Sequence, residues 1–340
     1  MLVTALVTPF SPDSTTLQLE AWRQLVDFQL EQGAGQVLLF GTTGEGPSLR
    51  SSERAALLDA ALEVAAPEQL MVGLGSGRPD QVLVRARDAL SRGVRDLLLV
   101  DCPYSGASSG ALRTRWYGPL AEQLPEARLF PYAVPGRTGT ELLPDDLARL
   151  AEDHPNVVGV KDATGRLARM TRVRELCGED FLLYCGDDPQ LRGALLDPTI
   201  RAQGACSVLA NVVPAALRQM VDRGREGSAG EVRNLANRLE PLMGLISFTA
   251  QEPLEVGGRT LSVPQRVRNP VPLKALLDLL GFPTGGCRAP LGPLGEEGRR
   301  HVAARLGELR RRDAELLAPF EAHFGEASFE QSGELVGPCA

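Results

Sequence analysis

The sequence predicts an α/β fold, a (β/α)₈ barrel followed by a C-terminal helical domain. Over residues 1–226, short apolar runs alternate with helix-length amphipathic segments. The runs are rich in Val and Leu and lack strict alternation, which is typical of parallel strands buried on both faces. Eight such runs are enough to close a barrel. Before any motif is considered, a doubly wound open sheet is the alternative.

The eight expected strands are short. They cover residues 3–10, 36–40, 70–75, 96–100, 127–132, 156–161, 181–186 and 204–210. The segments between them have helical patterns, as in residues 51–66, where Ser51 can cap the N-terminus and apolar residues recur at helical spacing. Glycines such as Gly93 stand before several strands and fit helix C-caps that turn the chain back to the sheet.

The alternation stops after about residue 226. Residues 227–320 form the expected helical domain, with helices over 229–248, 271–280 and 295–318. The stretch 251–268 carries Pro and Gly and is interpreted as an insertion that alters assembly. Residues 321–340 are expected to form a mobile tail, because the last of them have little to bury.

The composition excludes several classes of protein. The chain has 43% hydrophobic and 23% charged residues, as ordinary globular proteins do. Its net charge of −7 gives no support to a nucleic-acid partner. Because no apolar run reaches the ~18 residues of a membrane span and no signal peptide is evident, we expect a cytoplasmic protein without membrane contact. Six cysteines without a CxxC pair, and only three histidines, give little support to a metal site or a His-based triad.

Lysine is almost absent from this sequence. Among 36 Lys and Arg residues, Lys161 and Lys274 are the only lysines. Arginine has replaced lysine wherever a positive charge alone is needed, so the lysines that are left are candidates for tasks that arginine cannot perform. A guanidinium stays protonated, whereas a desolvated lysine can become a neutral amine nucleophile. A tightly packed structural lysine is the ordinary alternative.

Polar residues collect where the expected strands end, which is where barrel enzymes place their catalytic groups. Lys161 ends the sixth run and Tyr132 the fifth. The loops after the runs carry Thr42 and Thr43, Tyr104 and Ser105, Arg137, and Gly186 and Asp187. Each has an ordinary structural interpretation, and their joint placement at one mouth favours a site. Burial behind an apolar run is expected to lower the pKa of Lys161 and free the amine for imine formation.

Several motifs occur together in this order: GTTGEG (41–46), YAVPGRTG (132–139), GVKDATG (159–165) and GDD (186–188). With NPVPLKALL (269–277) and CRAPLGPL (287–294), they resemble the dihydrodipicolinate synthase family, which includes 4-hydroxy-tetrahydrodipicolinate synthases and N-acetylneuraminate lyases. The resemblance runs from residue 2 to 315, and this combination of motifs is specific. It implies a (β/α)₈ barrel with a C-terminal helical domain, assembled as a homotetramer or homodimer.

The resemblance also implies roles for single residues. Lys161 falls on the Schiff-base lysine, Tyr132 on the tyrosine that shuttles protons, and Thr42 on the threonine that relays them. The expected substrate-binding residues are Thr43, which falls on the hydroxyl that holds the pyruvate carboxylate, with Arg137, Gly186 and Cys206. Lys274 falls in a structural stretch. No metal and no organic cofactor are implied, since the lysine imine with pyruvate carries the chemistry.

Two positions distinguish branches of this family. Arg137 matches the arginine by which the synthases receive the carboxylate of aspartate semialdehyde, a task suited to a fork-shaped cation. The synthases usually have two tyrosines after the proline of the fourth strand, the second completing a hydroxyl relay across a dimer interface. Here the sequence is Pro103-Tyr104-Ser105, so the relay position carries Ser105 unless Tyr104 or water helps.

The implied reaction condenses pyruvate with aspartate semialdehyde to 4-hydroxy-tetrahydrodipicolinate, a step of lysine and diaminopimelate biosynthesis. Three alternatives stay open. A related pyruvate-dependent aldolase would cleave a 2-keto-3-deoxy acid, 4-hydroxy-2-oxoglutarate or sialic acid. A pyridoxal-phosphate enzyme would also use a lone lysine. The third alternative is a catalytically impaired relative of the family, an interpretation that Ser105 at the relay position allows.

Overall fold

The structure, a computed structural model, describes residues 1–325. Its centre is a closed barrel of eight parallel strands in sequence order. The strands are β1 (Leu2–Ala5), β2 (Gln36–Leu39), β3 (Leu70–Gly73), β4 (Asp96–Val100), β5 (Arg128–Ala133), β6 (Gly159–Asp162), β7 (Leu182–Cys185) and β8 (Gly204–Ser207). The barrel closes where Val3 of β1 pairs with Cys206 of β8. The prediction of a (β/α)₈ barrel is confirmed, and the open sheet is wrong.

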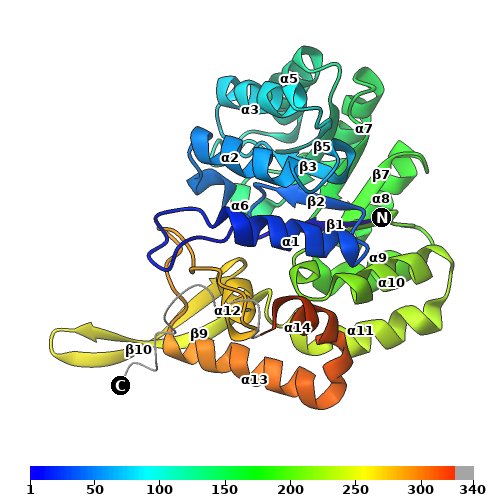
Figure 1. The fold of residues 1–340 in the computed structure, drawn as a ribbon. Helices are drawn as coiled ribbons and strands as arrows, with labels where there is room; N and C mark the ends of the chain where they lie inside the picture. The colour runs from blue at the N-terminus through cyan, green and yellow to red at the C-terminus, as the bar shows by residue number, and fades with distance from the viewer. Residues whose placement is uncertain (326–340) are drawn as a thin grey trace.

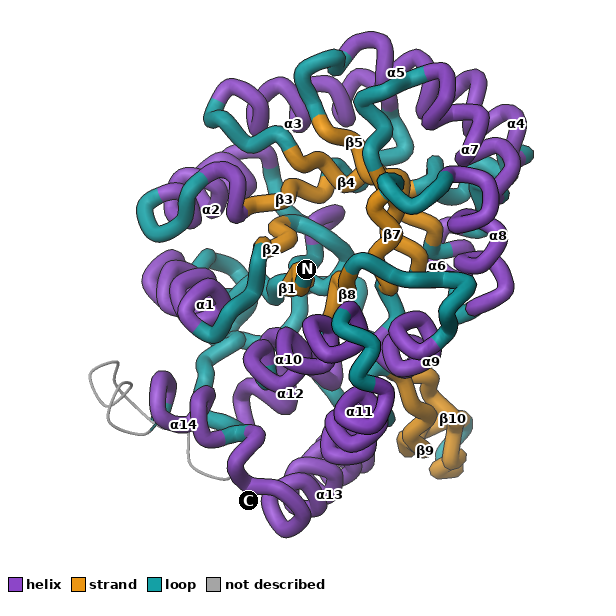
Figure 2. The backbone as a smooth tube through the Cα atoms, turned by 90° about the vertical axis from the view of Figure 1, so that its right-hand side faces the viewer, coloured by secondary structure: helices purple, strands orange, loops and turns teal. Residues whose placement is uncertain are grey.

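Helices surround the barrel, as Figure 2 shows in a view into the ring of strands. Those of the barrel are α1 (Leu19–Glu31), α2 (Ser51–Leu62), α3 (Pro79–Ser91), α4 (Ser109–Ala111), α5 (Gly118–Gln123), α6 (Pro135–Thr138), α7 (Pro144–Asp153), α8 (Leu167–Cys177), α9 (Leu191–Leu196) and α10 (Pro214–Arg225). Ser51 is the first residue of α2 rather than its cap. At the N-terminal end of α2, the Glu53 carboxylate forms the capping contact instead, because it accepts a hydrogen bond from the Arg50 backbone N–H at 2.9 Å.

Two apolar layers hold the barrel together. The strands are buried along nearly their whole length, which explains why their sequences show no alternation. One layer lies between the strands and the surrounding helices and contains Trp22, Phe28 and Leu97. The other fills the barrel interior with residues such as Met71, Phe130 and Tyr184. Buried polar side chains lie at both ends of this interior layer: Gln36 donates to Asp96 at 2.7 Å where β2 and β4 begin, and Lys161 lies where β6 ends.

The C-terminal part packs against one side of the barrel (Figure 1). It contains α11 (Ala229–Met243), α12 (Val271–Leu279), α13 (Glu296–Asp313) and α14 (Ala318–Phe324). The predicted division at residues 226 and 227 falls between α10 and α11. The predicted start of the tail at residue 321 falls inside α14, because Phe320 and Phe324 are buried and fix this last helix. The rest of that tail, 326–340, lies outside the described residues.

The expected insertion at 251–268 has regular secondary structure. It lies within a two-stranded antiparallel ribbon of β9 (Ser247–Val256) and β10 (Arg259–Arg268). The helix expected over 229–248 therefore ends at Met243, where the chain turns into β9. Gly257 and Gly258, both at positive φ, form the two-residue turn that glycine favours.

Candidate active site

Lys161 and Tyr132 meet at the C-terminal end of the barrel because they occupy paired positions on neighbouring strands. Tyr132 of β5 is the register partner of Lys161 in β6. The Lys161 Nζ lies 4.5 Å from the centre of the Tyr132 ring. Lys161 is only 5% exposed and Tyr132 only 7%. The two side chains that the sequence singled out thus form one buried amine–phenol pair.

Gly186 and Cys206 complete the surroundings of this amine. A Cβ at Gly186 would lie 2.9 Å from both Cγ and Cε of Lys161, so the lysine side chain runs directly across this glycine. Cys206 of β8 is buried, and its sulfur is a hydrogen-bond partner of Lys161. Burial raises the pKa of the Cys206 thiol. Both residues contact the reactive side chain itself.

The pKa of Lys161 differs from the expectation. Burial acts to lower it, but Cys206 and Tyr132 beside the amine, and the Asp188 carboxylate, outweigh burial and raise the pKa of Lys161 above its usual value. The predicted lowering is therefore wrong for the free site. The barrel mouth is dry, but it is lined by groups that favour the ammonium form.

A cavity of about 310 Å³ opens at this end of the barrel. Thr42, Tyr132 and Arg137 line it, from the loops and strand ends of β2 and β5, and Gly75 to Gly77 form another part of its wall. Lys161 is not one of the lining residues. Tyr132 joins the cavity to Lys161, because Tyr132 lines the cavity and its ring centre lies 4.5 Å from the amine. The volume fits a small organic acid with its acceptor.

The loop after β2 folds tightly because of its glycines. A Cβ at Gly46 would lie 2.0 Å from the Phe40 carbonyl oxygen, so only glycine permits this return of the chain. Glu45 within the loop is held at φ 52. The loop exposes Thr42 to the cavity and buries Thr43 beside it.

Asn269, which was not predicted as a site residue, contacts two of the predicted binding residues, Thr43 and Arg137. Its amide Nδ2 donates to the Thr43 hydroxyl at 2.9 Å. The backbone carbonyl oxygen of Asn269 accepts from Arg137 Nη2 at 2.8 Å. The sequence feature that could have indicated Asn269 is the NPVP motif, in which this buried asparagine directly follows β10. Asp188 was also missed: its carboxylate accepts from the backbone N–H of Val208 at 2.9 Å and acts electrostatically on Lys161.

Neither Tyr104 nor Ser105 lies among the residues that line the cavity. Ser105 donates to the Cys102 carbonyl oxygen at 3.0 Å, within its own loop, and is exposed. Tyr104 is fully exposed and stands at φ 62, a conformation that is rare for a side chain of this size. Its backbone N–H is held by the Thr138 carbonyl oxygen at 2.8 Å. Within one chain, the expected relay position is therefore not at the site.

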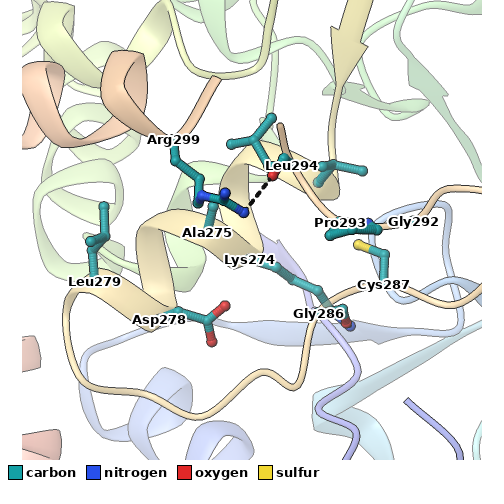
Figure 3. A pocket seen from close by; sticks show the side chains of 11 residues that line it. Lys274, Ala275, Asp278, Leu279, Gly286, Cys287, Gly292, Pro293, Leu294 and Arg299 are labelled. Carbon is teal, nitrogen blue, oxygen red and sulfur yellow. Dashed lines mark hydrogen bonds between the residues drawn. The ribbon is translucent and has the colours of Figure 1, made fainter. Parts of the chain in front are cut away.

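Lys274 does not line this cavity and forms a structural contact. Its Nζ lies 2.6 Å from Glu45 Oε1, with side chains 1% and 2% exposed, and 4.3 Å from the Phe10 ring centre. Figure 3 shows it beside a second cavity, of about 270 Å³, between α12 and the chain that leads into α13. The ion pair ties the C-terminal domain to the loop that carries Thr42 and Thr43.

Comparisons with known proteins agree with this architecture. Residues 1–309 match the model of the dihydrodipicolinate synthetase family. The chain belongs to that family. Similar members include the 4-hydroxy-tetrahydrodipicolinate synthase of Parasynechococcus marenigrum, 32% identical over 91% of this chain and 95% of that protein. That of Xanthomonas axonopodis is 33% identical over 86% of this chain and 89% of its own length.

Solved structures of family members superpose over most of the chain. The dihydrodipicolinate synthase of Thermotoga maritima has a TM-score of 0.79 at 30% identity, covering 91% of this chain and 97% of that one. A monomeric dihydrodipicolinate synthase variant gives 0.79 at 30% identity, covering 91% and 96%. Among residues 1–325, none of the helices is long and apolar enough to cross a membrane, and we find no cluster of His, Cys, Asp or Glu suited to a metal ion.

Proposed function

We propose that this family member is a 4-hydroxy-tetrahydrodipicolinate synthase that condenses pyruvate with aspartate semialdehyde through a Schiff base on Lys161. The observation that carries the proposal is the buried pair at the barrel mouth, with Lys161 Nζ 4.5 Å from the Tyr132 ring. Among a family of pyruvate-dependent lyases, Arg137 on the wall of the same cavity favours the synthase, because its guanidinium suits a carboxylate on the acceptor.

The first half of the reaction activates pyruvate. Lys161 loses a proton, and its neutral amine attacks the ketone carbon of pyruvate; water leaves and an imine forms. The protonated imine draws electrons from the neighbouring methyl group, which loses a proton to give an enamine. We assign to Thr43 the role of holding the pyruvate carboxylate. Because its oxygen accepts the Asn269 amide hydrogen, its own hydroxyl hydrogen is free to donate.

The second half joins the acceptor. The enamine carbon attacks the aldehyde carbon of aspartate semialdehyde, whose carboxylate is bound by Arg137, and the new alkoxide takes a proton through Tyr132 and Thr42. Such a positioned acid typically contributes ~10²–10⁴-fold. The acceptor amine then attacks the imine carbon, which closes the ring and releases Lys161. Gly186 contacts the aliphatic part of the Lys161 side chain, and Cys206 contacts its amine. Together these contacts hold the lysine side chain in position.

Tyr104 is a better candidate than Ser105 for the remaining hydroxyl of the relay. The Ser105 hydroxyl is engaged within its own loop, whereas Tyr104 is fully exposed on a strained backbone. A side chain presented in this way suits the site of a second copy. We therefore propose a homodimer or homotetramer in which Tyr104 reaches the partner's mouth. Small molecules are the only substrates, no cofactor is needed, and the cytoplasm is the proposed location.

Borohydride trapping with pyruvate tests the first half of this proposal. The expected result is a pyruvate-derived mass increase on the peptide that carries Lys161, absent from a Lys161→Arg variant. Steady-state assays test the second half by comparing pyruvate plus aspartate semialdehyde with sialic acid, 2-keto-3-deoxygluconate and 4-hydroxy-2-oxoglutarate. Absence of the adduct would defeat the imine mechanism. An adduct combined with faster turnover of one of the other acids would assign a related aldolase.

A further inference from the structure

One hydrogen bond connects the Thr43 hydroxyl to the C-terminal part of the molecule. Thr43 lies in the loop after β2, and Asn269 directly follows β10. The Asn269 amide nitrogen, Nδ2, donates to Thr43 Oγ1 at 2.9 Å, and the two residues are only 6% and 3% exposed. Within residues 1–325, the Thr43 hydroxyl has no other hydrogen-bond partner. The direction of this one bond therefore decides where the hydroxyl hydrogen can point.

The chemistry of the two groups sets that direction. An amide NH2 group only donates, whereas a hydroxyl donates one hydrogen and also accepts. Asn269 thus engages a lone pair of Thr43 Oγ1, and the hydroxyl hydrogen has to point elsewhere. A buried hydroxyl hydrogen without an acceptor costs free energy. We expect the bound substrate to supply that acceptor.

The loop that carries Thr43 is held in place without the help of this bond. Glu45, two residues further along, pairs with Lys274 at 2.6 Å and accepts from the Arg288 backbone N–H at 2.8 Å. These contacts fix the backbone of the loop against the C-terminal part. The bond from Asn269 is therefore left to orient the hydroxyl rather than to hold the loop.

The backbone of residue 269 is fixed as well. Its N–H donates to the Ile246 carbonyl oxygen at 2.9 Å, and its carbonyl oxygen accepts from Arg137 Nη2 at 2.8 Å. Neither bond involves the Asn269 side chain. A substitution at this position can therefore change the bond to Thr43 and leave the contact with Arg137 in place.

We propose that Asn269 is a positioning residue that determines specificity: by keeping the Thr43 hydroxyl a donor, it selects 2-oxo acids over their neutral 2-oxo amides. The inference rests on the proposed function, in which Thr43 holds the pyruvate carboxylate. Both oxygens of a carboxylate accept hydrogen bonds, whereas a primary amide replaces one of them with an NH2 donor. A hydroxyl that has to donate suits the carboxylate, and hydrogen bonds to a charged acceptor are the stronger ones.

Aspartate at position 269 reverses the bond with almost no change of shape. It keeps an oxygen in the place of Asn269 Oδ1, which is buried and has no partner in the described part of the chain, and replaces only the donor. An ionised carboxylate accepts and cannot donate, so the Thr43 hydrogen turns towards it and a lone pair faces the substrate. The Arg137 guanidinium, bonded to the backbone of the same residue, favours this ionised form.

Borohydride trapping of the full chain with two substrates tests the proposal. Adduct formation is measured at about pH 8 and limiting substrate, with pyruvate and with its neutral amide, pyruvamide. We expect Asn269→Asp to lower the preference for pyruvate over pyruvamide by about tenfold or more, the value of one hydrogen bond to a charged group. Gln265→Glu makes the same amide-to-carboxylate change at an exposed position of β10, so this control should keep the parent preference.

Asn269→Leu separates hydrogen-bond direction from packing. Leucine fills a similar volume but neither donates nor accepts, so we expect a smaller loss of preference than with aspartate. A residue that matters only for packing would slow both substrates alike in both variants, and this result overturns the proposal. Thermal unfolding checks that each variant is folded.

Thr43→Val gives a second measurement that leaves Asn269 intact. Valine has the shape of threonine without the hydroxyl, so the preference for pyruvate should fall here too, and adding Asn269→Asp should change it no further. A parent chain that traps pyruvate, together with an unchanged preference in Asn269→Asp or Thr43→Val, refutes this inference alone. A parent chain that traps neither substrate refutes the proposed function and this inference with it.

Discussion

Substituting Gly186 with alanine tests whether the position of Lys161 controls imine formation. The added Cβ would lie 2.9 Å from Cγ and Cε of Lys161 and 3.1 Å from Ala163 Cβ. Ordinary carbon contacts are about 3.5–4.0 Å, so the lysine chain must move by roughly 0.6–1.1 Å. Gly186 is not at positive φ, so the backbone accepts alanine. The lysine side chain must absorb the change.

The expected effect is on rate more than on folding. A displacement of about 1 Å at a reacting group costs about 10²-fold in rate, or roughly 2.7 kcal/mol of barrier. Overpacking costs about 1–3 kcal/mol of stability, which leaves a folded protein to assay. The assay is the rate of borohydride-trapped adduct at saturating pyruvate. Gly136→Ala, at the same mouth but with nothing within 4 Å, is the control and should keep the parent rate. A Gly186→Ala variant as fast as this control would refute the reasoning.

Three further predictions concern charge and the relay. Since the pKa of Lys161 is raised, its neutral fraction, and with it the imine-formation rate, should rise about tenfold per pH unit between about pH 6 and 9 in stopped-flow or quench measurements; a plateau near pH 7 would contradict this. Glu45→Gln breaks the buried pair with Lys274 and should cost about 3–5 kcal/mol in urea unfolding; a loss below about 1 kcal/mol would place the pair with exposed ones. Tyr104→Phe should lower kcat about 10²-fold without affecting the pyruvate adduct, while Ser105→Ala stays near the parent; the reverse order would return the relay to Ser105.

The barrel was predictable because its signal is strong and local. Buried parallel strands read as continuous apolar runs, so each of the eight runs overlaps an observed strand. The placement of Lys161 and Tyr132 also followed from the sequence, since strand ends converge at one face of a barrel. Neither conclusion required knowledge of a long-range contact.

The features that escaped prediction depend on contacts distant in sequence. The pKa of Lys161 was expected to fall with burial, but Cys206, 45 positions away on β8, reverses the direction. The ribbon was hidden by Pro253 and Pro264, which break the usual composition of a strand even though the alternation over 252–263 is present. The role of Asn269 depends on a loop more than 200 residues earlier in the chain.

The conformation of the turn after β4 could not be predicted from the sequence either. The choice between Tyr104 and Ser105 depends on a backbone conformation, φ 62 at Tyr104, that no pattern of residue types announces. Proteins store such strain at functional positions. Both residues were predicted as candidates, and the structure distinguishes them: the Ser105 hydroxyl bonds to the Cys102 carbonyl oxygen, whereas the Tyr104 side chain is fully exposed.

The burial of both lysines has a practical consequence for chemical modification. Lys161 and Lys274 are 5% and 1% exposed, and the ammonium group of Lys274 is locked to Glu45. The surface accordingly offers no lysine side chain to acylating dyes, aldehyde fixatives or immobilisation resins, and such procedures must use other groups. A small amine-reactive compound able to enter the barrel mouth would, for the same reason, find Lys161 as the one lysine within its reach.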